Sequence, residues 1–242
     1  MPRQPVTVQT LRLPTTDSTN LHARRMYEAG ERGPLWVVAE RQSAGRGRLG
    51  RQWESGRGNL YASALVPPPR SEPPTALTFA AALAARDAVA AHVAGEARDN
   101  VRLKWPNDVL LGGRKVAGIL LESPGGAVVA GIGINVAHHP EATRWPATHL
   151  GGGVGVDAVL GTLQARFEHW RAVLDRDGFA PVRAAWTDAA WGLGSEVVVE
   201  TGNRRIVGTA RGLDASGALR IDTPTGAETV SAGEVAWRAR TG

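Results

Sequence analysis

The sequence contains no cysteine among its 242 residues. This absence excludes disulfides, zinc–thiolate sites, iron–sulfur clusters and thioester-forming nucleophiles from the chain. No stretch reaches the roughly 18 apolar residues that a membrane-spanning helix requires, and the first residues lack an apolar core of signal-peptide length. We therefore expect a cytoplasmic protein whose chemistry comes from charged and polar side chains.

The overall composition is that of an ordinary folded protein, with 43% hydrophobic and 21% charged residues. The length suits one large domain, or one of about 190 residues plus a small one. A net charge of +5 is compatible with nucleic-acid binding, but the charge is unevenly distributed. Five arginines fall between positions 41 and 57, where Glu54 is the only acidic residue. Such a focused patch suits a small anionic ligand or an acidic partner better than a long duplex.

Glycines alternate with arginines in the segment 45–51. Glycines allow backbone N–H groups to approach a ligand closely, and arginines supply planar sets of donors that match phosphate and carboxylate oxygens. The segment therefore indicates an anion-binding loop, although a solvated basic loop would have the same composition. We refer to residues 45–51 as the arginine loop.

The arginine loop has the glycine spacing of the G-x-G-x-x-G dinucleotide fingerprint, at Gly45, Gly47 and Gly50. That fingerprint requires a helix to begin at the third glycine. Residues 51–58 contain too many helix breakers to form one, and the segment 59–66 that follows has the pattern of a strand. No Gly-Lys-Ser/Thr follows either, so neither a Rossmann site nor a P-loop is expected.

Hydrophobic periodicity predicts the remaining elements. Helices are expected at 21–30, 75–94, 157–175 and 179–191. Strands are expected at 35–39, 59–66, 101–105 and 128–136, with a hairpin at 109–122 around a Gly-Gly turn. Short alternating runs at 196–200, 205–211, 218–222 and 228–230 predict a small C-terminal barrel.

Polar residues stand at the ends of consecutive predicted strands: Lys104, Asn107, Asp108, Lys115 and Asn135. Taken singly, a surface position is the simpler explanation of either lysine. Together, and beside the arginine loop, they supply the positive charge and fixed donors that stabilise a phosphoryl or adenylyl transition state. Ser18 and Thr19 precede the first helix, where they could cap it or bind a polar ligand group.

With these residues set out, the chain closely resembles the biotin protein ligases (biotin-[acetyl-CoA-carboxylase] ligases). Five motifs of that family occur in order: Ser18-Thr19-Asn20, Gly45-Arg46-Gly47-Arg48-x-Gly50-Arg51, Lys104-Trp105-Pro106-Asn107-Asp108, Lys115-x-Ala117-Gly118-Ile119-Leu120 and Gly131-Ile132-Gly133-Ile134-Asn135. The resemblance implies an α+β fold: a mixed β-sheet with flanking helices, like class II aminoacyl-tRNA synthetases and biotin synthetases, plus a small C-terminal SH3-like barrel. It implies a biotin/ATP-binding catalytic domain at 1–192 and the SH3-like domain at 193–242.

The resemblance also implies a two-step ligase reaction with biotin, ATP and Mg²⁺. Biotin and ATP would form biotinyl-5'-AMP, and a lysine of a biotin carboxyl carrier protein would then accept the biotinyl group. The enzyme would mainly position two anions and offset their charge.

Site residues follow from the matching positions. Biotin would be bound by Ser18, Thr19, Gln42, Gly45, Arg46, Lys115, Gly118 and Gly133. The nucleotide would be bound by Arg48, Arg51, Trp53, Asn107, Asn135 and Arg238. Lys115 would be catalytic, polarising the biotin carboxylate and the α-phosphate, with Arg48 and Arg51 as further catalytic residues on a loop that orders over the adenylate. Asp108 would bind magnesium or act on the incoming lysine, and the sequence does not choose between these roles.

Several alternatives accompany this interpretation. A lipoate or octanoate protein ligase of the same fold is a related possibility, and a basic nucleic-acid-binding protein is one of a different class. The barrel strands lack the interleaved aromatic residues that stack bases, which argues against the latter. Only sixteen residues precede Asp17, too few for a helix-turn-helix module, so we expect no DNA partner. A homodimer is possible, and the basic surface suits an acidic carrier domain.

Overall fold

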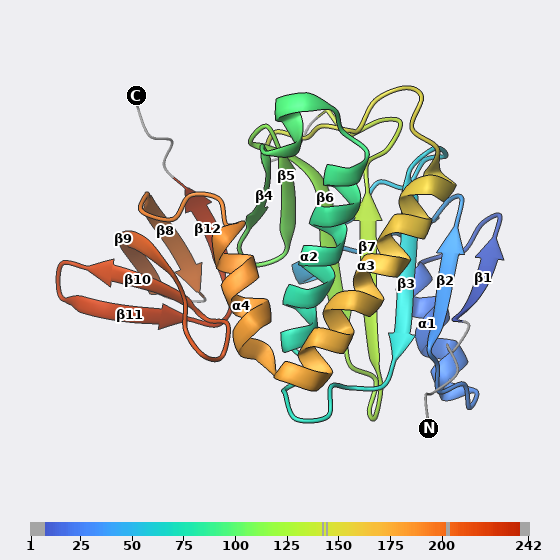
Figure 1. Ribbon diagram of the computed structural model, residues 1–242, viewed down its shortest axis with the longest axis horizontal. Coiled ribbons are helices and arrows are strands. Elements are labelled where there is room, and N and C mark those ends of the chain that lie inside the picture. Colours follow the sequence, from blue (N-terminus) through green and yellow to red (C-terminus); the bar gives the residue numbers. More distant parts are fainter. Residues whose placement is uncertain (1–7, 142, 144, 202–203, 238–242) are drawn as a thin grey trace.

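The computed structural model describes residues 8–141, 143, 145–201 and 204–237. Its centre is a seven-stranded sheet in the order β1-β2-β3-β7-β6-β5-β4 (Figure 1). Only the β1–β2 pair is parallel, and all other neighbours are antiparallel. The strands are β1 (Gln9–Leu13), β2 (Leu35–Ala39), β3 (Leu60–Val66), β4 (Val101–Lys104), β5 (Asp108–Leu111), β6 (Arg114–Glu122) and β7 (Val128–Ile134).

Helices cover both faces of this sheet (Figure 1). They are α1 (Thr19–Glu28), α2 (Ala76–Ala91), α3 (Val156–Asp177) and α4 (Phe179–Asp188). Successive side chains of a strand point to opposite faces, so the uninterrupted apolar run of β2 supplies two cores. Trp36 and Val38 join the core beneath α2 and α3, whereas Leu35 and Val37 join a smaller core beneath α1.

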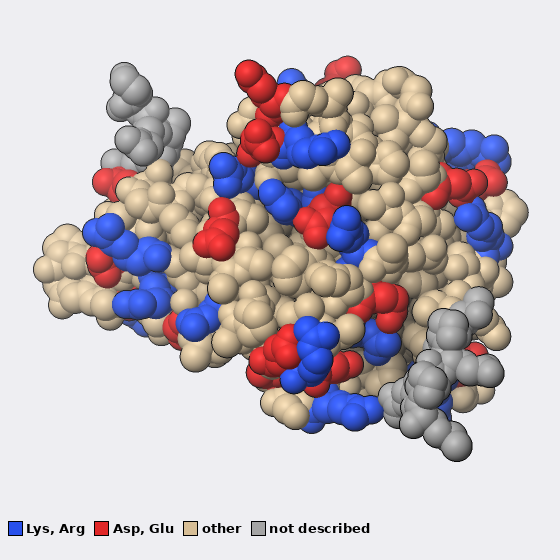
Figure 2. All heavy atoms as spheres, viewed as in Figure 1, with Lys and Arg blue, Asp and Glu red and all other residues tan. Residues whose placement is uncertain are grey.

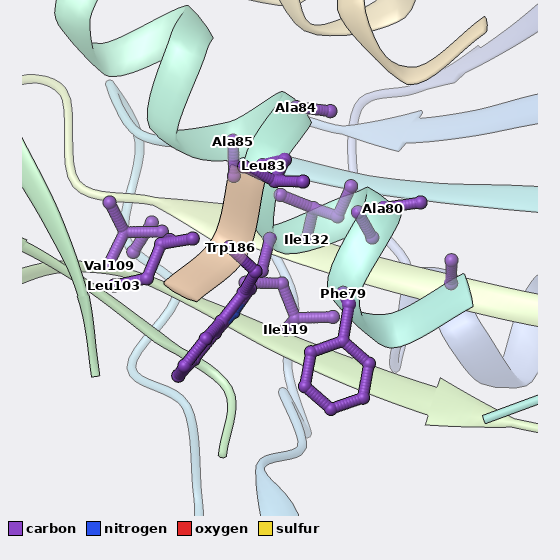
Figure 3. Close-up of a cluster of buried hydrophobic side chains, with 14 of the residues drawn as sticks. Phe79, Ala80, Leu83, Ala84, Ala85, Leu103, Val109, Ile119, Ile132 and Trp186 are labelled. Atoms are coloured by element: carbon purple, nitrogen blue, oxygen red, sulfur yellow. The ribbon is translucent and has the colours of Figure 1, made fainter. Parts of the chain in front are cut away.

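The larger core depends on the size contrast between α2 and its neighbours (Figure 3). Helix α2 presents mostly alanine to the core, and these small side chains leave room for Trp186 of α4 and for the helix's own Phe79. Figure 3 shows Trp186 of α4 and Phe79 filling this space against side chains of the strands, with the two rings 5.7 Å apart in an edge-on arrangement. Both rings are almost fully buried, so this packing fixes α4 against the main domain.

A second sheet lies beyond β4, at the end of the molecule opposite β1 (Figure 1). Its strands are β8 (Glu196–Thr201), β9 (Arg204–Leu213), β10 (Leu219–Thr223), β11 (Gly226–Val230) and β12 (Glu234–Trp237), in the antiparallel order β11-β10-β9-β8-β12. The buried Trp105 of the main domain donates a hydrogen bond from Nε1 to the Gly217 carbonyl, at 3.2 Å. This contact joins the two sheets directly.

The predicted elements are confirmed in type and order, with two further strands. Strand β1 was not expected and extends the large sheet by pairing with β2, and β12 lies beyond the four predicted C-terminal runs and pairs with β8. Helix α1 begins at Thr19, two residues earlier than predicted, so Ser18 occupies its N-cap position. In the part of the chain that the structure describes, no helix has the length and apolar character required to cross a bilayer.

Candidate active site

A cavity of about 540 Å³ opens on the sheet between the arginine loop, the β4–β5 turn and the end of β12. Most residues that the sequence assigned to the site line it: Ser18, Thr19, Gln42, Arg46, Arg48, Arg51, Trp53, Asn107, Asp108, Lys115, Gly118, Gly133 and Asn135. Gly45 is not among the residues that line this cavity, and a Cβ added to it would come within 2.5 Å of Ser55 Oγ. Arg238 lies outside the described residues.

A buried polar wall forms the end of the cavity near α1. The backbone N–H and hydroxyl of Thr19 both donate to Gln42 Oε1, at 2.8 and 3.1 Å, and Gln42 Nε2 donates to Ser55 Oγ at 2.8 Å. Ser18 is 2% exposed and makes no side-chain capping bond to α1. Its hydroxyl is therefore not used as a helix cap. These contacts fix the direction of each donor and acceptor before a ligand binds.

Asn20 connects this wall to the arginine loop through Glu122. Its side chain accepts a hydrogen bond from Ser63 Oγ at 2.6 Å and donates one to Glu122 Oε2 at 2.8 Å. Glu122 in turn pairs with Arg46, at 3.1 Å between Oε1 and Nη1. The carboxylate of Glu122 thus ties the arginine loop to the polar wall.

Glycines on β6 and β7 allow a side chain to lie flat on the sheet. A Cβ added to Gly118 or Gly133 would approach the indole of Trp53 to 2.9 or 2.6 Å, which is too close for real atoms. The indole therefore covers the two glycines that were expected to frame the biotin ring. Its buried Nε1 has no hydrogen-bond partner in the described structure. An unsatisfied buried donor is costly, so this N–H is available to an acceptor on a ligand.

Two lysines converge on one carboxylate in the middle of the cavity. Asp108 Oδ1 lies 2.6 Å from Lys115 Nζ, and Asp108 Oδ2 lies 3.5 Å from Lys104 Nζ. Strand pairing places Lys104 opposite Asp108, and β6 brings Lys115 to the other side of the carboxylate. All three positions are fixed by backbone ladders, so the group is rigidly placed.

Arg48 reaches into the same region from the arginine loop. Its Nη1 donates to Asn107 Oδ1 at 3.3 Å, and Asn107 Nδ2 donates to the Ile119 carbonyl at 2.7 Å. Burial lowers the pKa of the Arg48 guanidinium, and the nearby charge of Asp108 opposes that decrease. The next residue, Leu49, has φ +56° and is 71% exposed at the mouth of the cavity.

Asn135, expected at the nucleotide, lines the cavity and donates from Nδ2 to the Thr148 carbonyl at 3.0 Å. This bond helps to hold the segment after β7 that carries Trp145, another cavity residue.

Sequence reasoning gave no role to Glu122, Ser63 or Trp145 and no specific role to Asn20. The position of Glu122 could have been predicted, since it lies four residues after Gly118. Residues an even number of positions apart in a strand point to the same face. No such signal existed for Trp145, whose segment has no regular periodicity.

Comparison with known proteins supplies the family. Residues 12–138 match the biotin/lipoate A/B protein ligase family, and residues 192–238 match the biotin protein ligase C-terminal domain. The biotin--[acetyl-CoA-carboxylase] ligase of Paracoccus denitrificans is 42% identical over 92% of this chain and 98% of its own length. The bifunctional ligase/repressor BirA of Bacillus subtilis is 32% identical over 82% of this chain and 65% of its own length.

Solved structures agree with this assignment. The biotin protein ligase from Aquifex aeolicus, in complex with biotin and ATP, superposes with a TM-score of 0.82 at 30% identity. The match covers 95% of this chain and 98% of that one, including the C-terminal domain. The fold expected from the sequence is therefore confirmed across both parts of the molecule. The chain belongs to the biotin/lipoate A/B protein ligase family and, within it, to the biotin protein ligases.

Proposed function

We propose that this protein is an ATP-dependent biotin protein ligase that forms biotinyl-5'-AMP and then biotinylates a lysine of a biotin carboxyl carrier protein. One observation supports the proposal most strongly. A pre-ordered polar wall and the Lys104–Asp108–Lys115 group line the same cavity. The wall suits a neutral, hydrogen-bonding ligand head. The lysines, with Arg48 beside them, suit the two anions that must meet for adenylation.

In the first step a biotin carboxylate oxygen attacks the α-phosphorus of ATP, the bond from that phosphorus to the bridging oxygen breaks, and pyrophosphate leaves. Ser18, Thr19 and Gln42 bind the ureido group, while Gly45, Gly118 and Gly133 frame the rings. Lys115 stabilises the charge that develops between carboxylate and phosphate. In the second step the carrier lysine nitrogen attacks the biotinyl carbonyl carbon, and AMP leaves.

The arginine loop holds the intermediate. Arg46 binds the biotin side, Arg48 and Arg51 contact carboxylate and phosphates, and Trp53, Asn107, Asn135 and Arg238 contact the nucleotide. An anion at the cavity centre competes with Glu122 for Arg46 and gives the loop a second arrangement. Retention of the adenylate then depends on how well the loop orders over it.

Asp108 is the assigned candidate for a magnesium ligand. Mg²⁺ is commonly held by one or two carboxylates plus substrate phosphates, and it neutralises phosphate charge when bound. The described residues contain no cluster of three or more typical metal-binding side chains, and two ammonium groups already contact Asp108. This environment fits a single carboxylate contact to a metal carried by ATP. The second assigned role of Asp108 is to act on the incoming carrier lysine in the transfer step.

The finer expectations on partners and location belong to the same proposal. We expect an acidic carrier domain, no DNA partner, a possible homodimer and a cytoplasmic location, with the domain boundary at residues 192 and 193. On the face that Figure 2 shows, Lys and Arg side chains are interspersed with Asp and Glu. A duplex-binding face would gather one sign of charge.

Exchange of labelled pyrophosphate into ATP tests the proposal, with purified protein, Mg²⁺ and no carrier. Biotin should support exchange, and lipoate and octanoate should not. Exchange with lipoate or octanoate in place of biotin would assign the protein to the related lipoyl chemistry. Absence of exchange with all three acids would contradict adenylation as the activity.

A further inference from the structure

The chain uses lysine at only two positions, Lys104 and Lys115, against 26 arginines. Both lysines contact the same carboxylate, that of Asp108. A chain that uses arginine for nearly every cation has thus placed its two lysines in a single group. The proposed function assigns the reaction step to Lys115 and gives Lys104 only a share in the positive charge of the site.

Lys104 is the more buried of the two. Its side chain is 9% exposed, compared with 27% for Lys115, and that of Asp108 is 12% exposed. Its Nζ lies 4.7 Å from the centroid of the Trp145 ring, a cation–π distance. Trp145 is held by a hydrogen bond from Nε1 to the Gly113 carbonyl and by the ring of Trp191, 5.2 Å away. Lys104 therefore has a defined position that does not depend on substrate.

Lys115 has to change partners during the proposed reaction. Its Nζ lies 2.6 Å from Asp108, so it is committed to that carboxylate before substrate binds. Turning toward the biotin carboxylate and the α-phosphate leaves Asp108 without its nearest counter-charge. An uncompensated carboxylate in a largely buried site is strongly unfavourable, and this cost would oppose the movement of Lys115.

We propose that Lys104 is a positioning residue that keeps Asp108 compensated while Lys115 moves to the reacting anions. This inference rests on the proposed function. Lys104 acts through Asp108 and needs no contact with substrate. A compact ammonium suits this task because it fits between the Trp145 ring and the carboxylate, whereas the planar guanidinium of arginine needs more room and a different geometry. Arg48 is a further cation near Asp108, and its Nη1 donates to Asn107 Oδ1.

The test compares Lys104→Met with a matched control in biotin-dependent pyrophosphate exchange. Met keeps the length of the side chain and removes the charge. Arg102→Met removes a cation two residues earlier on β4, where the side chain donates to the Asp188 carbonyl and lies outside the cavity lining. We expect Lys104→Met to lower kcat by about 10- to 100-fold, a loss typical of a misplaced catalytic group. The KM for biotin should change little, and Arg102→Met should resemble the wild type.

A double-mutant cycle separates positioning from direct substrate contact. If Lys104 acts through Asp108, Lys104→Met should cause no further loss of kcat in an Asp108→Asn background, because the charge to be compensated is absent. An undiminished loss in that background would overturn the proposal, as would a normal kcat in Lys104→Met itself. Lys104→Arg should recover part of the rate lost in Lys104→Met, because the charge returns in an imperfect geometry.

Two controls keep the outcome interpretable. Thermal unfolding of each variant establishes that the protein is folded, and Lys104→Gln replaces Lys104→Met in every comparison if the Met variant does not fold. Wild-type protein without biotin-dependent exchange would contradict the proposed function. Active wild type with unaffected Lys104 variants would contradict the positioning role alone.

Discussion

Two cationic regions line the cavity, and they are built differently. The arginine loop lies on an irregular segment, and the Arg46 side chain is 43% exposed while paired with Glu122. The two lysines stand on β4 and β6, the strands on either side of β5, where ladder hydrogen bonds fix their backbones and Asp108 of β5 contacts both ammonium groups. Groups that must meet a reacting atom benefit from rigid support, whereas groups that admit and retain a ligand must move. This difference is the basis on which we propose that the lysines on the strands take part in the reaction and that the loop retains the intermediate.

The largest effect is expected from Lys115→Ala. Loss of a fixed positive charge at the reacting centre should reduce adenylate formation by about 100- to 1,000-fold, in the range of a lost oxyanion-hole donor. Pyrophosphate exchange measures this, with Arg114→Ala as control because the exposed Arg114 neighbours Lys115 but does not line the cavity. Near-normal exchange in Lys115→Ala would refute its catalytic assignment.

Arg48→Ala and Arg51→Ala should have a different consequence. Adenylate should still form, but its release should accelerate by about 10- to 100-fold, since a hydrogen bond to a charged group contributes about 1.5–3 kcal/mol. Trapping released biotinyl-5'-AMP over time measures the rate. Arg57→Ala is a suitable control because that exposed arginine pairs with Glu40 outside the cavity lining. Unchanged release in both variants would remove the retention role of the loop.

The sequence predicted the loop and the elements around it because their signals are local. Alternating glycine and arginine between two apolar runs predicts an anion-binding loop, and the turn at Pro106-Asn107 makes the pairing of Lys104 with Asp108 foreseeable. Strand β1 was missed because it is short and partly exposed, and its alternation is limited to Leu11, Arg12 and Leu13, so its pairing with β2 identifies it.

The tie between Arg46 and Glu122 was missed for a different reason. The two residues are far apart in sequence, and only the assembled sheet brings Glu122 of β6 beside both the loop and Asn20. The packing of the Trp53 indole against Gly118 and Gly133 was missed for the same reason. The glycines predicted a close approach, but the identity of the approaching side chain depends on the fold.

A smaller effect should follow from changing the polar wall beneath the loop. Gly131→Ala would place a methyl group against Asn20 Oδ1 and displace the side chain that holds Glu122. We expect a loss of about 1–3 kcal/mol in the free energy of unfolding, as for other overpacked sites, together with weaker biotin binding. Urea denaturation measures the first. Gly152→Ala, in open space, is the control, and equal stability of the two variants would show that the wall tolerates displacement.

The smallest effect concerns pH and a histidine pair outside the cavity. His139 Nδ1 and His149 Nδ1 lie 2.6 Å apart, and burial, with the charges of His139, His138 and Arg114, lowers the pKa of His149 from its usual 6.5. Between the lowered pKa of His149 and pH 6.5, the unfolded chain then binds more protons than the folded one. Stability should therefore be constant above about pH 6.5 and decrease slightly as pH falls toward the lowered pKa.

Thermal unfolding of wild type and His149→Asn between pH 5 and 8 measures this difference. The variant should lose that part of the pH dependence, and identical profiles for the two proteins would contradict the assignment of the effect to His149.

The most direct test of the division between strands and loop is a single-turnover experiment on wild type, Lys115→Ala and Arg48→Ala. Each protein is mixed with labelled ATP, Mg²⁺ and excess biotin, and both enzyme-bound and released biotinyl-5'-AMP are quantified over time. The account predicts that wild type forms and retains adenylate, Arg48→Ala forms and releases it, and Lys115→Ala forms almost none. Equal loss of adenylate formation in the two variants, with no difference in retention, would contradict it.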